Sequence, residues 1–454
     1  MDVTSSAEIA NAKHTCDSNP PRPSGVGRVS LFWDESFLWG LIAFKTFLRL
    51  RINFDLITSA DIREGILDTY DVLFVPGGWA SNKVVALGEL GKEHTRRFIK
   101  EGGSYLGFCG GAGMALQHDD GISLVPISRK PTSIRVPSFS GKIQLHHELV
   151  DHPIWENIPD GAAFHAWWPG QFSIADTGGI KVLASYGDPE KGSFVADLPV
   201  SPTTDWDRWE RSYGTNLNPN RIKGEPALIE ADYGRGKVLL SYLHFETPED
   251  ELGHRVLLNM LSYLLKGKAV TSTVASSRDS DITKARSPMS RTGETVTNLT
   301  RELEALALDL ISFGEEHFLW YWRNSWLIQW RRGVRGIEYC TLYAMLKQLA
   351  ELSLVLDDLD EAIVKELEEI RELALPFFEE AKQLLTSERY AMNYRPLSPL
   401  KSDDEQIQRM RKRLFSNSKR FGGHYKQIID RIDDLLLPLL ISAKNRSVPT
   451  LPHA

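Results

Sequence analysis

Hydrophobic positions divide the chain into two parts with different patterns. Up to about residue 268, short apolar runs alternate with Gly- and Pro-rich turns, as in strands that are buried on both faces of a parallel sheet. The clearest runs lie within residues 27–36, 70–78, 102–111 and 236–246. Residues 36–51, between the first two runs, have the apolar spacing of a helix. The pattern predicts an α/β fold, with a flavodoxin-like parallel sheet and helices on both faces.

The second part of the chain has a helical pattern and few glycines. It is separated from the first by a polar stretch with almost no large apolar residues, which is typical of a linker. Both ends of the chain are also polar or rich in proline. The predicted order is a disordered tail, the α/β domain, a flexible linker, an all-α helical bundle and a second tail, at residues 1–25, 26–268, 269–297, 298–446 and 447–454.

A row of tryptophans marks the helical part. Trp322, Trp326 and Trp330 recur every four residues within residues 300–352, which predicts one face of a helix packed against neighbouring helices. The alternative is that they stack on a ligand. The segment around Pro376 is interpreted as one or two helices, with a bend near this proline. No catalytic motif is recognisable after the linker, so we expect this part to form a homo-oligomer or to bind a protein partner.

Composition and charge exclude several classes of protein. With 53 Lys and Arg against 60 Asp and Glu, the net charge of −7 does not favour a nucleic-acid partner. The three cysteines, Cys16, Cys109 and Cys340, are too few for a disulfide framework or a zinc cluster, which suits the cytoplasm. We expect no metal and no cofactor. Residues 37–48 are apolar but too short to span a membrane, Lys45 interrupts them, and no secretory signal precedes them.

The segment Gly-Phe-Cys-Gly-Gly at residues 107–111 follows an apolar run directly. A Gly-x-nucleophile-x-Gly turn lets a strand bend sharply into a helix and exposes the nucleophile at the bend. Cys109 is therefore the candidate nucleophile, and the start of the following helix would favour its thiolate. The alternative is that Cys109 is a small buried side chain in a Gly-rich turn.

His244 and Glu246 follow the last apolar run of the first part. His244 could activate a thiol, and Glu246 could orient the imidazole, because residues i and i+2 share a face of an extended segment. Gly78 ends another run, and its N–H and that of Gly110 could form an oxyanion hole. The alternatives are a surface histidine at a strand end and an ordinary turn.

Other residues near the predicted strand ends are candidates for a substrate pocket. Asp34 and Glu35 follow the first strand and could bind a substrate amine, although acids at a helix start are also stabilised by the helix dipole. The remaining candidates for the pocket are Trp79, Trp168 and Gln171. Aromatic residues are more often part of the core, so packing is the alternative role for the two tryptophans.

Together these residues resemble the class I glutamine amidotransferase-like superfamily, and most closely its biotin-protein ligase N-terminal-domain type. That type carries Gly-Gly-x-Tyr-Leu-Gly-x-Cys-x-Gly-Ala, and residues 102–112 read Gly-Gly-Ser-Tyr-Leu-Gly-Phe-Cys-Gly-Gly-Ala. The resemblance covers about residues 27–266. The roles that it implies are nucleophile, base, orienting carboxylate and oxyanion-hole donors, for Cys109, His244, Glu246, Gly78 and Gly110.

The chain departs from this pattern at two points. Phe245 stands where amidotransferases have the proline of His-Pro-Glu, so the backbone between His244 and Glu246 is less constrained. A biotin-ligase catalytic signature is absent from the sequence, and residues 234–237, Gly-Arg-Gly-Lys, are interpreted as a turn. The resemblance therefore implies a fold and a site, and it does not imply biotinylation.

Three functions follow from these features. The first is a cysteine-dependent amidohydrolase or amidotransferase-like enzyme, which would act on a small-molecule amide through a thioester of Cys109. The second is a non-catalytic ligand-binding or regulatory module on the same fold, with the helical part for assembly or partner binding. The third is a scaffold in which the helical bundle carries the function and the α/β domain is a degenerate enzyme.

Overall fold

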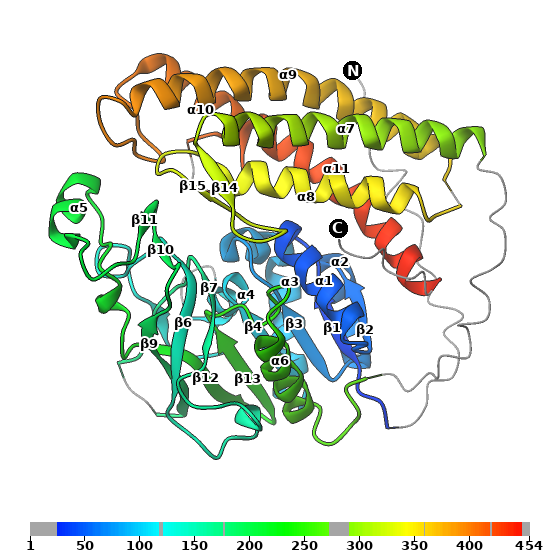
Figure 1. Ribbon diagram of the computed structural model, residues 1–454. Helices are drawn as coiled ribbons and strands as arrows, with labels where there is room; N and C mark the ends of the chain where they lie inside the picture. Colours follow the sequence, from blue (N-terminus) through cyan, green and yellow to red (C-terminus); the bar gives the residue numbers. More distant parts are fainter. Residues whose placement is uncertain are drawn as a thin grey trace.

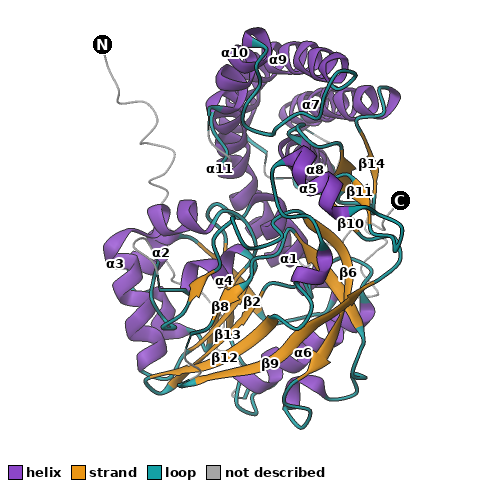
Figure 2. Cartoon of the chain, turned by 90° about the vertical axis from the view of Figure 1, so that its left-hand side faces the viewer, coloured by secondary structure: helices purple, strands orange, loops and turns teal. Residues whose placement is uncertain are grey.

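The computed structural model describes residues 25–117, 121–175, 178–271, 290–357, 359–417 and 420–446. Both predicted tails, apart from Gly25, and the central part of the predicted linker lie outside these ranges. Figure 1 shows an α/β part with a layer of long helices above it, and Figure 2 shows the same two layers from the side.

The ends of the predicted linker belong to the two folded parts. Ala269 and Thr271 form isolated bridges with residues of the α/β part. On the other side, helix α7 begins at Arg291, and the side chain of Ser290 caps it by accepting a hydrogen bond from the backbone N–H of Gly293. Composition did not reveal this helix start, because its first turn is polar and resembles the linker before it.

The first part of the chain contains a parallel sheet with the strand order β2-β1-β3-β4-β13. The strands are Phe54–Ile57 (β2), Val29–Phe32 (β1), Val72–Val75 (β3), Ser104–Phe108 (β4) and Gly236–Ser241 (β13). Strands β1, β3 and β4 are buried along their whole length, which explains why they are continuous apolar runs in the sequence. This order is flavodoxin-like, and it confirms the predicted fold class.

Helices cover both faces of these strands. Helices α1 and α6 lie on one face, and α2 and α3 lie on the other (Figures 1 and 2). The helices of this part are Phe37–Arg49 (α1), Ser59–Arg63 (α2), Ala80–Lys100 (α3), Gly110–Ala115 (α4) and Glu251–Leu264 (α6), with a 3-10 turn at Ile66–Thr69. Helix α1 is buried almost all round, because the sheet lies on one side of it and the C-terminal helices lie on the other. Its apolar sequence reflects this double burial.

Beyond β13 the sheet continues with antiparallel strands. In order they are Pro226–Tyr233 (β12), Ile180–Pro189 (β9), Phe139–His147 (β6), Phe194–Val195 (β10) and Leu198–Pro199 (β11), and Ala163–Trp167 (β7) also pairs with β6. The other elements are Ser128–Arg129 (β5), which pairs with Phe172–Ser173 (β8), helix α5 (Trp206–Tyr213), and 3-10 turns at Pro153–Trp155 and Pro219–Arg221. Strands β12 and β13 form a hairpin whose turn lies at residues 233–236. The Gly-Arg-Gly-Lys segment is therefore part of a turn, as predicted.

The predicted helical part is present, but its tryptophan row is not on a helix. The helices are Arg291–Glu316 (α7), Gly336–Ser353 (α8), Glu361–Ala391 (α9, which continues through Pro376), Glu405–Phe415 (α10) and Gly423–Asn445 (α11). Between α7 and α8, strands Trp320–Trp322 (β14) and Ile328–Trp330 (β15) form a hairpin. The prediction of one helix face was therefore wrong. The four-residue spacing also fits two short strands and a turn, in which the Asn324 side chain accepts hydrogen bonds from two backbone N–H groups.

The helical part is docked on the α/β part. Its polar contacts include those of Asp433 with Trp33 (Oδ1 to Nε1, 3.0 Å), Lys426 with Glu35 (2.8 Å), Glu351 with Lys45 (2.8 Å) and Gln329 with Ser140 (3.0 Å). Trp33 and Glu35 directly follow β1, so the contact includes the carboxyl edge of the parallel sheet. Within the described ranges, no helix combines the length and the apolar character needed to cross a membrane.

Candidate active site

Cys109 stands at the bend between β4 and α4. Its φ of 48° and ψ of −103° lie in a region that residues other than glycine rarely adopt. Its backbone N–H donates to the Ser241 carbonyl at 2.8 Å, and its own carbonyl accepts from the Gly113 N–H at 2.9 Å. The first contact joins the bend to the end of β13, and the second opens α4. The chain thus makes the strand–cysteine–helix turn that the sequence predicts, with the Cys109 side chain partly exposed.

Close packing around the bend requires glycine on both positions that follow the cysteine. A Cβ on Gly110 would lie 2.0 Å from the Gly78 carbonyl oxygen, and a Cβ on Gly111 would lie 2.0 Å from the Val75 carbonyl oxygen. The Tyr105 hydroxyl donates to the Gly111 carbonyl at 2.7 Å and anchors the start of α4. The backbone of α4 therefore lies directly against the end of β3.

His244 and Glu246 form a completely buried pair. The Nδ1 atom of His244 lies 2.7 Å from Oε1 of Glu246, and both side chains have no exposed surface. The sequence suggested that the pair forms along an extended segment. Strand β13 ends at Ser241, however, and the pair forms across the turn that follows it. The ring of Trp39 packs on the imidazole with 4.3 Å between centroids. The turn and the indole hold the imidazole in place and leave Nε2 as its free end.

The electrostatics of His244 favour its protonated form. Burial by itself lowers the pKa of His244, but the Glu246 carboxylate and the Cys109 thiol raise it to about 10 in total. His244 Nε2 is buried and has no hydrogen-bond partner of regular geometry among the described residues, yet Cys109 is close enough to contribute to the pKa. Such contacts are often loose in a free enzyme and tighten when substrate binds.

Two backbone amides next to Cys109 are free to bind a ligand. Neither the Gly78 nor the Gly110 N–H donates a hydrogen bond within the described part of the chain. The Gly78 nitrogen lies 3.0 Å from the place that a Cβ on Gly110 would take, so the two peptides are neighbours. Gly78 has a φ of 116°, which only glycine adopts without strain. The arrangement fits a pair of oxyanion-hole donors.

Asp34 and Glu35 have partners within the protein. The Asp34 carboxylate accepts a hydrogen bond from the backbone N–H of Ser59 at 2.7 Å, at the start of α2. Glu35 accepts one from the Asn82 amide at 3.0 Å and pairs with Lys426 of α11 at 2.8 Å. These contacts use both carboxylates to hold the β1–α1 loop, which argues against the pocket role considered for them. They favour the alternative of an acid at a helix start for Asp34.

Trp79 and Trp168 are half-buried, and each contacts an aromatic ring of the helical part. Trp79 meets Phe421 edge-on with 6.4 Å between centroids, and Trp168 packs against Trp330 at 4.8 Å. Trp168 also contacts Trp39, the indole that lies on His244. The wall beside the buried histidine is therefore built from both parts of the chain.

Gln171 holds the backbone of two loops. Its Oε1 accepts a hydrogen bond from the Val136 N–H at 2.8 Å, and its Nε2 donates to the Arg221 carbonyl at 3.5 Å. The side chain is buried, with 1% of its surface exposed. Gln171 is thus a positioning residue for the loop that contains Val136, and its amide is not directed at a ligand.

Lys83, which was not a candidate from the sequence, is a buried residue near the site. It lies in the first turn of α3, has no exposed surface, and its Nζ donates to the Asp34 carbonyl at 3.1 Å and to the Ser36 hydroxyl. A Cβ on Gly78 would lie 3.2 Å from Lys83 Cε, so the lysine side chain packs directly against the loop that contains Gly78. Burial lowers the pKa of Lys83 to about 7, although the charges of Glu35, Asp34, Asp433 and Cys109 oppose this shift. No sequence signal distinguished this lysine from Lys100, which is exposed in the same helix.

The Lys83→Met variant is expected to be more stable than the wild type at neutral pH, and the gain should shrink at high pH. The pKa of Lys83 falls from 10.5 unfolded to about 7 folded, so the unfolded state binds more protons between these values. The wild type therefore regains stability as the pH rises from 7 to 10, by up to about 1.4 kcal/mol per pH unit, and the methionine variant does not. Loss of two hydrogen bonds reduces the gain by about 2 kcal/mol.

Urea unfolding at pH 7, 8.5 and 10 measures this difference. Lys100→Met, at an exposed position of the same helix, is the control, and its stability should change with pH in the same way as that of the wild type. A stability difference between Lys83→Met and the wild type that is the same at all three pH values would contradict the lowered pKa.

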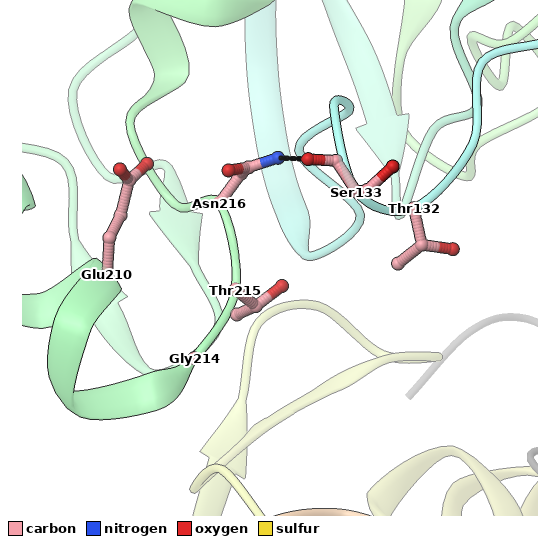
Figure 3. A pocket seen from close by; sticks show the side chains of 6 residues that line it. All are labelled: Thr132, Ser133, Glu210, Gly214, Thr215 and Asn216. Carbon is pink, nitrogen blue, oxygen red and sulfur yellow. Dashed lines mark hydrogen bonds between the residues drawn. The ribbon is translucent and has the colours of Figure 1, made fainter.

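A separate surface pocket lies away from these residues. Figure 3 shows it, with the Asn216 amide donating to the Ser133 carbonyl at 2.9 Å. Its volume is about 320 Å³, and its lining residues are Thr132, Ser133, Glu210, Gly214, Thr215 and Asn216. None of the predicted site residues lines it, and it contains no nucleophile paired with a base. The candidate site at Cys109 is therefore separate from this pocket.

Several solved structures resemble about half of this chain. A scan against protein-family models found no match, and a search of the curated proteins found no relative. Solved structures that match include a protein described as a GMP synthase subunit from Thermoplasma acidophilum (13% identity, TM-score 0.35), PurLQS from Thermotoga maritima (16%, 0.36) and a glutamine amidotransferase from Thermotoga maritima (12%, 0.34). Each covers 53% of this chain, and this chain covers 95%, 99% and 98% of them.

Other matching structures have different printed activities. A β-galactosidase from Bacillus circulans sp. alkalophilus matches with 15% identity and a TM-score of 0.33, over 54% of this chain and 32% of its own. At these identities the likeness concerns an α/β fold and not a reaction.

Proposed function

We propose that the protein is a cysteine-dependent enzyme that cleaves a C–N amide bond of a small molecule, through a thioester of Cys109. The observation that carries the proposal is the convergence of three strand ends. A strained cysteine, a buried histidine–glutamate pair and two free glycine amides meet beyond β4, β13 and β3. This is the set of groups that a thiol nucleophile, its base and its oxyanion require.

The reaction follows from these positions. The Cys109 sulfur attacks the amide carbonyl carbon, and the carbonyl oxygen becomes an oxyanion that accepts hydrogen bonds from the Gly78 and Gly110 N–H groups. The His244 imidazolium donates its Nε2 proton to the leaving nitrogen as the C–N bond breaks, which leaves a thioester and releases ammonia or an amine. Water, with its proton taken by His244, then cleaves the thioester to a carboxylic acid and restores the Cys109 thiolate beside the His244 imidazolium. Glu246 keeps the imidazole oriented throughout.

Alkylation by iodoacetamide tests the thiol and its base. Cys109 is expected to react at pH 7.5, whereas Cys340, which is fully buried and whose pKa burial raises to about 12, should not. In the folded His244→Gln variant the Cys109 rate is expected to fall about tenfold or more, because the imidazolium no longer stabilises the thiolate. Peptide mass spectrometry over time measures both cysteines in one sample.

Turnover of amides tests the reaction itself. Glutamine, asparagine and simple primary amides are incubated with the protein, and ammonia release and a mass increase on the Cys109 peptide after acid quench are measured. Both signals are expected to vanish in Cys109→Ser, while far-UV circular dichroism stays unchanged. Equal rates in the wild type and the serine variant would contradict the proposal, and an unreactive Cys109 would favour the non-catalytic ligand-binding module.

A further inference from the structure

Four half-buried aromatic rings lie near Cys109, two from each part of the chain. The α/β part contributes Trp79 and Trp168, and the helical part contributes Trp330 and Phe421. Each ring of the α/β part contacts one ring of the helical part, with centroids 6.4 Å apart in the first pair and 4.8 Å apart in the second. We call these four rings the aromatic rim.

The pair of Trp79 and Phe421 lies on the side of the two glycine amides. Trp79 directly follows Gly78 in the chain. The Gly78 nitrogen lies 3.0 Å from the place that a Cβ on Gly110 would take, and Gly110 is the residue after Cys109. One side of the rim is therefore fixed next to the nucleophile by backbone contacts.

The pair of Trp168 and Trp330 lies on the side of the buried histidine. The ring of Trp39 packs on the imidazole of His244 at 4.3 Å, and Trp168 contacts Trp39 edge-on with 6.4 Å between centroids. A Cβ on Gly77 would lie 2.8 Å from the Trp39 ring and 3.0 Å from His244 Cε1, so the glycine loop contacts this side as well. A single indole thus separates the second pair from the candidate base.

The aromatic rim has free surface for a ligand. The Cys109 side chain and all four rings are partly exposed, whereas Trp39 behind them is 8% exposed. The indole N–H groups of Trp79, Trp168 and Trp330 form no hydrogen bond within the described part of the chain and are not completely buried, so these ring edges reach solvent. Trp168 also has a φ of 51°, which residues other than glycine rarely adopt, and strained residues of this kind cluster at functional sites.

We propose that the aromatic rim binds an aromatic ring of the substrate beside Cys109, so that the helical part takes part in substrate selection. Aromatic rings pair favourably in edge-to-face and offset arrangements, and sites for small molecules are lined mainly by apolar and aromatic side chains. This inference rests on the proposed function, because it makes the substrate of Cys109 an amide that carries an aromatic group. It also gives the contact between the two parts of the chain a role in binding.

Two alkylating reagents that differ by a phenyl group test the aromatic rim. Iodoacetamide and 2-iodo-N-phenylacetamide have the same reacting carbon, and with both the thiolate displaces iodide to form a C–S bond. The ratio of the phenyl reagent's rate to the iodoacetamide rate is expected to be about tenfold higher at Cys109 than for free N-acetylcysteine, which corresponds to about 1.4 kcal/mol. In Phe421→Leu and in Trp330→Leu this ratio is expected to fall by about threefold or more, because each variant removes one ring of the rim.

The substitution Phe318→Leu is the matched control. It removes a ring of the helical part that is 74% exposed and outside the rim, and it should change the ratio by less than about twofold. Both reagents alkylate the same thiol, so a variant that alters only the reactivity of Cys109 changes both rates and leaves their ratio constant. Far-UV circular dichroism establishes that each variant is folded.

The outcomes separate this inference from the proposed function. A wild-type ratio no higher than that of N-acetylcysteine, a ratio that neither folded rim variant lowers, or an equal fall in Phe318→Leu would overturn the rim while leaving the reactive thiol in place. If Cys109 reacts with neither reagent, the proposed function fails, and the rim is judged by ligand-observed NMR with N-phenylacetamide. Binding that weakens in Phe421→Leu or Trp330→Leu but not in the control supports the rim, and any other result refutes it.

Discussion

Alanine in place of Gly110 is expected to lower the free energy of unfolding by about 3 kcal/mol and to stop the reaction of Cys109 with iodoacetamide. The added Cβ would lie 2.0 Å from the Gly78 carbonyl oxygen, which is backbone and cannot rotate away. Relief requires α4 to move off β3, and overpacking of this kind costs about 1–3 kcal/mol before the strain on Cys109 is counted. Urea unfolding measures the free energy of unfolding, and alkylation with iodoacetamide measures whether the bend still presents a reactive Cys109.

Gly113→Ala is the matched control in the same short helix. A Cβ on Gly113 would lie 3.3 Å from the Ala80 Cβ, a tight contact that a small shift relieves. The helix propensity of alanine offsets part of that cost, so we expect a change within about 1 kcal/mol and normal alkylation of Cys109. If the two variants have the same stability, the close contact between the Gly78 and Gly110 peptides does not exist in solution.

Glutamine in place of Glu246 is expected to destabilise the folded protein by about 3 kcal/mol at pH 6.5. The substitution removes the charge that His244 faces in a fully buried pair, and breaking such a pair costs about 3–5 kcal/mol. The reactivity of Cys109 should also fall in this variant, because burial then favours the neutral imidazole of His244. The same residue thus contributes to both the stability of the site and its chemistry.

The effect of Glu246→Gln should depend on pH with a definite sign. The pKa of His244 is raised from 6.5 to about 10 on folding, so its stabilising contribution is complete below pH 6.5 and is lost as the pH rises towards 10. The stability difference between wild type and variant should therefore shrink by up to about 1.4 kcal/mol per pH unit over this window. Unfolding by urea at four pH values from 6.5 to 9.5 measures it, with the exposed Glu249→Gln as control. A constant difference across the window would show that His244 is neutral.

Much of the candidate site could be predicted from local patterns. The glycines around Cys109 indicated a tight bend, because only residues without a Cβ fit two backbones in contact. His244 and Glu246 were recognisable as a pair, although they meet in a turn after β13 and not along a strand. For Asp34 and Glu35 the sequence left two roles open, and only the partners on α2 and α11 distinguish them.

The helical part shows where periodicity was insufficient. A spacing of four placed Trp322, Trp326 and Trp330 on one helix face, but these residues lie in a hairpin and the turn that joins its strands. Aromatic residues are common in both helices and strands, and only the pairing of Trp320 with Trp330 across the hairpin decides between them. The spacing of the tryptophans therefore could not predict their role.

Local hydrophobicity and backbone freedom were enough to predict the succession of buried strands, the bend at Cys109 and the division into α/β and helical parts. The docking of the helical part at the edge that carries the candidate site, and the burial of Lys83 beside it, became apparent only in the folded structure. Burial and pairing depend on residues far apart in the chain. The sequence alone does not reveal whether the side chain of a lysine or arginine contacts solvent, a carboxylate or neither.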